Sequence, residues 1–267
     1  MMNIDFNKKG LIVLSTYRSG GTQLTRILDI LCVQHFQPNC DDKWVSKGEV
    51  EVDIIGDVLT ETMNALYSDE KRFQVWLLNN PLSILALYSN NKFSQLVKDY
   101  NIIHLSRLNK ANGILSLGLW ERMIEFGAFS DVALNKGRFD KQAMQSFHTH
   151  LLSNPLSYVD VSLGHNALEG YKSSLATVGS KLMIWTYQDN INKCLASMYR
   201  LPVLFYEEYE QDHENLLKNH FPWANDVARE EIKNTYRYKI PYVYKDYRKY
   251  YQDDIIKLMN EWGIKNL

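Results

Sequence analysis

The segment LIVLSTYRSGGT, residues 11–22, decides the fold that we expect for this chain. Its first four residues are a short apolar run, which is typical of a buried strand. After residue 22, apolar residues recur from Leu24 to Leu31 at i, i+3, i+4 and i+7, which places them on one helix face. The two glycines between strand and helix allow successive N–H groups to face one anion. This order predicts a phosphate-binding loop, with an ordinary glycine turn as the alternative.

The rest of the chain alternates short apolar runs with longer amphipathic stretches, the pattern of a parallel sheet with crossover helices. Residues 34–50 have no clean periodicity, so we expect a loop near the site there. We predict an α/β fold with a single P-loop-type domain over residues 1–267, in which helices flank a central parallel sheet. Further strands are expected at 73–78, 102–105 and 203–206, and helices from Pro81 and near 114–123, 138–153, 170–199 and 252–262.

Composition and charge narrow the classes of function. Hydrophobic residues make up 45% of the 267, and the formal net charge of −1 gives no support for a nucleic-acid or anionic-membrane partner. No apolar run approaches the ~20 residues of a membrane span, and we expect no export signal, so the chain is expected to be cytoplasmic. Three cysteines without a CxxC pair indicate neither a disulfide framework nor a zinc site, and the oligomeric state is left open.

The side chains of the phosphate loop suit an oxyanion. Arg18 supplies a permanent charge in a fork that matches oxyanions, Ser19 and Thr22 carry hydroxyls, and Gly20 and Gly21 free the backbone. A helix that begins near Gly21 adds unpaired N–H groups and the positive end of its dipole. The Walker pattern GxxxxGK[ST] is absent, because no lysine occupies the loop.

At these residues the chain resembles the sulfotransferases that use 3'-phosphoadenosine-5'-phosphosulfate, and most of all their bacterial carbohydrate branch. Tyr17-Arg-Ser-Gly-Gly-Thr22 is similar to the family's 5'-phosphosulfate loop, and His104-Leu-Ser-Arg107 with Ser116 is similar to its 3'-phosphate element. Leu204-Phe-Tyr-Glu-Glu208 is similar to a late strand end of the family. Two positions depart from the pattern: Gly21 replaces a hydroxyl residue, and Leu108 stands where many members have arginine.

The resemblance implies roles for these residues. The loop would bind the donor's 5'-phosphosulfate, Arg107 and Ser116 would bind its 3'-phosphate, and the product would be adenosine 3',5'-bisphosphate. Arg18 would stabilise charge on the leaving oxygen but would not act as an acid, because guanidinium keeps its proton. Sulfuryl transfer of this kind requires no metal, and the sequence has no convincing metal cluster.

An acceptor hydroxyl needs a base within hydrogen-bonding reach. The bacterial branch places a glutamate in the loop after the first helix, and the matching segment here holds Asp41 and Asp42. These are the first candidates, with a solvated acidic turn as the alternative, and His35 is the next. His104 is expected to be a core histidine.

The sequence therefore predicts a sulfotransferase that acts on an acceptor hydroxyl, with a carbohydrate or glycolipid as the candidate acceptor. Two alternatives stay open: a kinase with a degenerate phosphate loop, and a non-catalytic nucleotide- or glycan-binding protein on the same scaffold. A segment rich in tyrosine and lysine at 236–251 either covers the bound nucleotide or packs as an amphipathic segment.

Overall fold

The structure is a computed structural model. It describes residues 2–17, 19–36, 45–49, 57–68, 73–113, 171–208 and 213–236, and a few positions between 256 and 263. The chain divides into two compact units, the first made of Met1–Leu108 with Tyr187–Lys239 and the second of Asn109–Thr186 with Ile240–Leu267. The sheet and the site described below belong to the first unit. The expectation of one domain over residues 1–267 stays a prediction.

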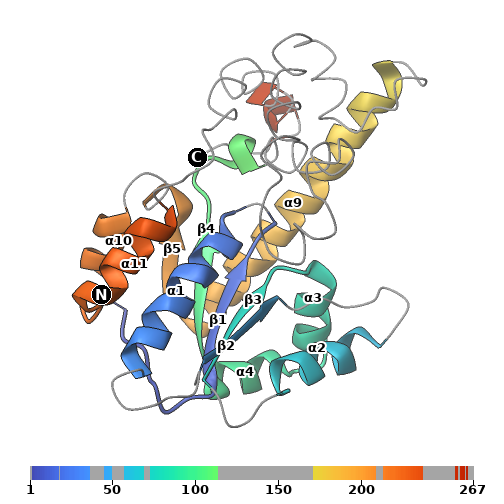
Figure 1. Cartoon of the computed structure of the whole chain (residues 1–267). Helices are drawn as coiled ribbons and strands as arrows, with labels where there is room; N and C mark the ends of the chain where they lie inside the picture. The colour runs from blue at the N-terminus through green and yellow to red at the C-terminus, as the bar shows by residue number, and fades with distance from the viewer. Residues whose placement is uncertain are drawn as a thin grey trace, which may run out of the picture. The chain divides into compact units, whose positions relative to one another are not determined.

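The described residues form a sheet of five parallel strands in the order β2-β3-β1-β4-β5 (Figure 1). Leu14 of β1 pairs with Leu78 of β3 on one side and with His104 of β4 on the other. Because the strands are parallel, their carboxyl ends share one edge, called the carboxyl edge from here on. The strands are β1 (Gly10–Ser15), β2 (Val45–Glu49), β3 (Phe73–Leu78), β4 (Tyr100–Ser106) and β5 (Val203–Phe205).

Helices connect these strands and pack on both faces of the sheet (Figure 1). Sequence signals explain several of their starts: Asn80 caps the helix that begins at Pro81 by accepting a hydrogen bond from the Leu82 N–H at 2.9 Å. The helices are α1 (Gly21–Phe36), α2 (Val58–Leu66), α3 (Pro81–Ser89), α4 (Phe93–Asp99), α9 (Tyr171–Tyr199), α10 (His213–His220) and α11 (Asp226–Tyr236), with a 3₁₀ turn, η2, at Tyr206–Glu208.

Two hydrophobic layers hold the sheet between the helices. Leu11 and Val13 of β1 pack with α1, α10 and α11, whereas Ile12 and Leu14 pack with α2, α3, α4 and α9. All four side chains are fully buried. Burial on both faces explains why β1 is a continuous apolar run rather than an alternating one.

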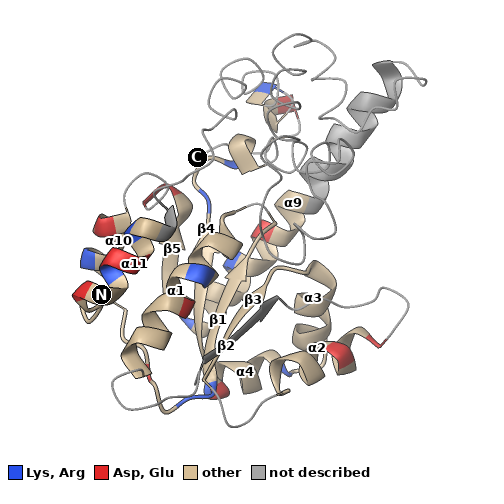
Figure 2. Cartoon of the chain, in the orientation of Figure 1, with Lys and Arg blue, Asp and Glu red and all other residues tan. Residues whose placement is uncertain are grey.

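Figure 2 shows where charge enters this fold. Strands β1, β3, β4 and β5 contain no charged residue, and the blue and red residues lie on helices and connecting segments. Around these four strands, the charged residues of the described part of the chain therefore lie in the segments that follow the strands or on the helices beside them.

The prediction of an α/β fold with a helix-flanked parallel sheet is confirmed, and the strands expected near 11–14, 73–78, 102–105 and 203–206 are present as β1, β3, β4 and β5. The expectation of a loop over 34–50 is wrong, because α1 continues to Phe36 and Val45–Glu49 forms β2. This strand has no apolar alternation, and its pairing with β3 rather than its own sequence defines it. The helices expected at 114–123 and 138–153 lie outside the described residues.

Candidate functional site

The carboxyl edge beside β1 is where this topology favours a ligand. The connection from β1 runs through α1 on one face of the sheet, whereas α3 and α4 after β3 lie on the other face. Connections that leave neighbouring strands toward opposite faces open a crevice at the carboxyl edge, and ligands of open α/β sheets bind there. The first expectation from the sequence, a site directly after β1, agrees with this topology.

The segment 15–22, for which the sequence predicts phosphate binding and which is called the phosphate loop from here on, turns sharply from β1 into α1. The Ser19 N–H donates to the Thr16 carbonyl at 3.2 Å, and Gly20 adopts a φ of 84°, a conformation that favours glycine. Helix α1 then begins at Gly21, and the Leu24 N–H donates to the Gly20 carbonyl at 3.0 Å. The N-terminus of α1, with its positive dipole end, therefore lies at the carboxyl edge.

Gly21 allows α1 to approach the sheet closely. A Cβ atom at this position would lie 2.5 Å from Ser15 Oγ and 2.6 Å from Leu77 Cδ1. Such distances leave no room for a side chain. Gly21 therefore has a packing role between α1 and the sheet.

Two serine hydroxyls of the loop are buried without a partner in the part of the chain that the structure describes. Ser15 and Ser19 are each 1% exposed, and neither Oγ has a hydrogen bond among the described residues. Thr22, in contrast, is exposed at the start of α1. Buried hydroxyls are usually satisfied in folded proteins, and the described residues do not supply the partner that these two would need.

Helix α9 supports the loop with buried amides. The Gln188 Nε2 donates to the Ser15 carbonyl at 3.3 Å and also to the Asn79 carbonyl, while its Oε1 accepts from the Tyr17 N–H at 3.1 Å. One turn later, the Asn192 Nδ2 donates to Thr16 Oγ1 at 3.4 Å. Both amides are fully buried. The ends of β1 and β3 are thus held by a helix that is far away in sequence.

Sequence reasoning missed Gln188 and Asn192. A signal was present, because four of the five residues 188–192 are polar, and the spacing of Gln188 and Asn192 puts these two on the same face of the helix. Fully buried polar side chains on a helix indicate partners in the neighbouring element.

Arg107 lies at the carboxyl edge and already has an anionic partner. Its guanidinium stacks over the Tyr206 ring, with Cζ 4.6 Å from the ring centroid, and its Nε lies 3.7 Å from the Glu207 Oε1. The other Glu207 oxygen accepts from the Leu108 N–H at 3.0 Å. The structure therefore joins two motifs that the sequence presented separately, the arginine after β4 and the Tyr-Glu pair after β5.

The structure brings Ser19, Gly20, Gly21 and Thr22 together in one loop, with Arg107 after the neighbouring strand β4. Arg18, Asp41, Asp42 and Ser116 lie outside the described residues, as do residues 237–251 of the tyrosine-rich segment.

His35 lies in the last turn of α1, away from the phosphate loop. Helix α1 has 16 residues, so its ends are about 24 Å apart. The His35 ring stacks on Phe6, four residues before β1, with centroids 3.8 Å apart. His35 therefore lies near the amino ends of the strands, which form the edge of the sheet opposite the carboxyl edge and are called the amino edge from here on. Its expected role as a base next to the phosphate loop is wrong.

The same geometry bears on the segment that holds Asp41 and Asp42. Its described ends are Phe36, which ends α1, and Val45, which pairs with Phe73 at the start of β3. Both ends lie at the amino edge. The positional argument for an aspartate base at the phosphate loop is therefore not supported by the described residues.

Comparisons and absences complete the site. No protein-family model, curated protein or solved structure matches this chain. Among the described residues, no group of three or more histidine, cysteine, aspartate or glutamate side chains is arranged to hold a metal ion. No helix in the described part of the chain is both long and apolar enough to cross a membrane.

Proposed function

We propose that the carboxyl edge binds the phosphate groups of a nucleotide, and that the protein transfers a sulfuryl group from 3'-phosphoadenosine-5'-phosphosulfate to an acceptor hydroxyl. The observation that carries this proposal is the phosphate loop. Gly20 turns the chain, Gly21 brings the N-terminus of α1 against the sheet, and the buried hydroxyls of Ser15 and Ser19 lack a partner among the described residues. A phosphate held there would satisfy both hydroxyls.

The residues of the loop have different roles in this proposal. The donor supplies an activated sulfuryl group when it is bound. Ser19 and the first N–H groups of α1 bind its 5'-phosphate oxygens, and Arg18 stabilises the charge that grows on the leaving oxygen. With the donor bound, the acceptor oxygen would form a bond to sulfur as the bond from sulfur to the 5'-phosphate oxygen breaks, and the acceptor's proton would pass to a base that the described residues of the loop do not supply. Adenosine 3',5'-bisphosphate and a sulfate ester leave the site.

Arg107 supports this proposal less directly. It lies after β4, next to the phosphate loop, as a 3'-phosphate partner would. Its guanidinium is only 3% exposed and already faces Glu207, so a 3'-phosphate would have to compete with this carboxylate. This pairing favours a second candidate, a binding protein or kinase that holds a nucleotide through its 5'-phosphates and does not recognise a 3'-phosphate.

A thermal-unfolding experiment with the full chain separates the two candidates. The sulfotransferase proposal predicts that adenosine 3',5'-bisphosphate stabilises the protein, by about 2.7 kcal/mol at roughly 100 times its Kd. AMP and ATP with Mg²⁺ should stabilise it far less. Equal stabilisation by AMP would support the second candidate, and equal stabilisation by ATP with Mg²⁺ would reject the sulfotransferase.

A pair of serine variants tests the loop itself. Ser19→Ala removes a hydroxyl from the proposed phosphate site and should weaken binding of adenosine 3',5'-bisphosphate. Ser83→Ala is the matched control, because Ser83 on α3 is also fully buried without a partner among the described residues and lies outside the loop. If both variants bind like the parent protein, the Ser19 hydroxyl does not contact the nucleotide.

A further inference from the structure

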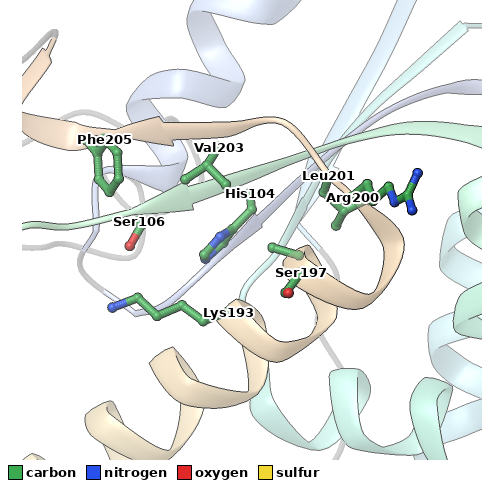
Figure 3. A pocket seen from close by; sticks show the side chains of 9 residues that line it. His104, Ser106, Lys193, Ser197, Arg200, Leu201, Val203 and Phe205 are labelled. Atoms are coloured by element: carbon green, nitrogen blue, oxygen red, sulfur yellow. The ribbon is translucent and has the colours of Figure 1, made fainter.

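A pocket of about 540 Å³ lies between β4, β5 and α9 in the first unit (Figure 3). This volume is within the range of small-molecule sites, about 300–1,000 Å³. His104 and Ser106 occupy alternate positions of β4, so both side chains project from the same face of the sheet, toward α9. The phosphate loop leads into α1, which packs on the opposite face.

The two β4 side chains are buried, and their polar atoms have no partner in the described part of the chain. His104 and Ser106 are each 1% exposed, yet neither ring nitrogen of His104 nor the Ser106 Oγ has a hydrogen bond among the described residues. Buried polar atoms are rarely left unsatisfied, and each is unfavourable when it is. Because both side chains line the pocket, an occupant that hydrogen-bonds to them would remove this cost.

The charge around the pocket selects an anion. Lys193 and Arg200 line it, and no carboxylate does. Lys193 pairs with the buried Asp189, with Nζ 2.9 Å from Oδ2, so the positive charge in excess is that of Arg200. Arg200 is exposed, and its side chain points away from His104 in Figure 3, so it contributes to the charge around the pocket and not to a direct contact with His104. An occupant with a single negative charge would balance the group.

His104 enters this site as a neutral ring. Burial, and then the nearby Lys193 charge, lower its pKa from 6.5 to about 4. A neutral imidazole donates one hydrogen bond and accepts another. The His104 N–H and the Ser106 O–H can therefore each donate to one oxygen of the same anionic group.

Apart from Ser197, the rest of the lining is apolar. Ala196 lines the pocket from α9, and Leu201 lines it from the segment between α9 and β5. Val203 and Phe205 project from β5. These walls suit a hydrocarbon or aromatic body rather than a fully hydrated inorganic ion.

We propose that this pocket binds a small carboxylate monoanion with an apolar body, whose carboxylate meets His104, Ser106 and Lys193. The body lies against Leu201, Val203 and Phe205. The site is separate from the phosphate loop, and it stands whether or not the nucleotide proposal is correct.

Benzoate is a suitable probe, and NMR of the histidine rings in the full chain is the readout. The His104 signals are assigned by their loss in His104→Gln. We expect benzoate to shift these signals saturably, and the uncharged isostere benzamide to bind at least 10-fold more weakly. Inorganic phosphate, which lacks an apolar body, should leave them unchanged. Unmoved His104 signals at saturating benzoate would overturn the site, and equal binding of benzamide would overturn the choice of an anion.

A conservative variant locates the carboxylate. Ser106→Ala removes one donor and should weaken benzoate binding about 3- to 10-fold, the effect of one hydrogen bond. Ser83→Ala again serves as the control, because Ser83 belongs to α3, which packs on the same face of the sheet, and does not line the pocket. Unchanged benzoate affinity in Ser106→Ala would place the anion elsewhere and overturn the assignment.

Discussion

Gly21 is the residue at which the fold and the phosphate loop depend on each other most directly. We expect Gly21→Ala to destabilise the protein by about 1–3 kcal/mol, because the new methyl group would overlap Ser15 Oγ and Leu77 Cδ1 unless α1 moved outward. That movement would also widen the loop and weaken nucleotide binding. Urea denaturation and a nucleotide titration measure the two effects.

Thr22→Ala is the neighbouring control. Thr22 is exposed, so its replacement should leave the free energy of unfolding nearly unchanged while it removes a hydroxyl from the loop. If Gly21→Ala were as stable as Thr22→Ala, the close approach of α1 to the sheet would not matter for stability.

His104 gives the fold a dependence on pH. The pKa of His104 is lowered from 6.5 to about 4 by burial and by Lys193, so the unfolded state binds more protons than the folded state between these two values. The stability is therefore complete above about pH 6.5 and falls as the pH drops. By pH 4, protonation of His104 in the unfolded state should have lowered the free energy of unfolding by about 3 kcal/mol. Urea denaturation at pH 7.5 and at pH 4.5 measures this loss.

His104→Gln isolates that contribution, because the variant has no group that titrates at this position. Relative to the variant, the parent should lose free energy of unfolding as the pH drops from 6.5 to 4. Above pH 6.5 the difference between the two proteins should be constant. Parallel pH profiles for the two proteins would show that His104 is protonated as easily in the folded state as in the unfolded state.

At the scale of elements, α9 determines the shape of the phosphate loop. We expect Gln188→Leu to destabilise the protein by about 3 kcal/mol, because the Ser15 and Asn79 carbonyls and the Tyr17 N–H would lose their buried partner. Gln188→Glu should be similarly damaging, because a carboxylate cannot donate to two carbonyls. Chemical denaturation of both variants gives the free energies.

Asn190→Ala is the matched control on the same helix, because Asn190 is exposed. It should change the unfolding free energy by less than about 0.5 kcal/mol. A Gln188→Glu protein as stable as the parent would mean that side-chain size, rather than hydrogen bonding, holds α9 against the loop.

Elements differ in how far the sequence predicts them. The apolar strands β1, β3 and β4 could be predicted because burial on both faces requires continuous hydrophobic runs. Strand β2, Val45-Ser-Lys-Gly-Glu49, has no such run, so the sequence predicts a loop there. It lies at the edge of the sheet and pairs only with β3, so a long-range contact decides its conformation. The loop conformation around Gly20 and Gly21 was predictable because glycine itself is the signal.

At the scale of the whole molecule, the sequence does not predict the features that depend on contacts between distant segments. The strand order and the pairing of Arg107 with Glu207 depend on segments about a hundred positions apart. The hydrogen bond from Tyr17 to Gln188 joins residues 171 positions apart. Local patterns carry no information about such partners. The prediction of His35 as the base is wrong for the same reason, because the sequence does not show at which edge of the sheet α1 ends.

The dependence of the phosphate loop on α9 has a consequence for the newly made chain. Strands β1 to β4 are complete once Ser106 has left the ribosome. Gln188 leaves it 82 residues later. At 5–20 residues per second, this interval lasts roughly 4–16 s. During it the nascent sheet carries a phosphate loop whose carbonyls still face water, so we expect the chain to gain its affinity for ligand late in synthesis, when α9 docks.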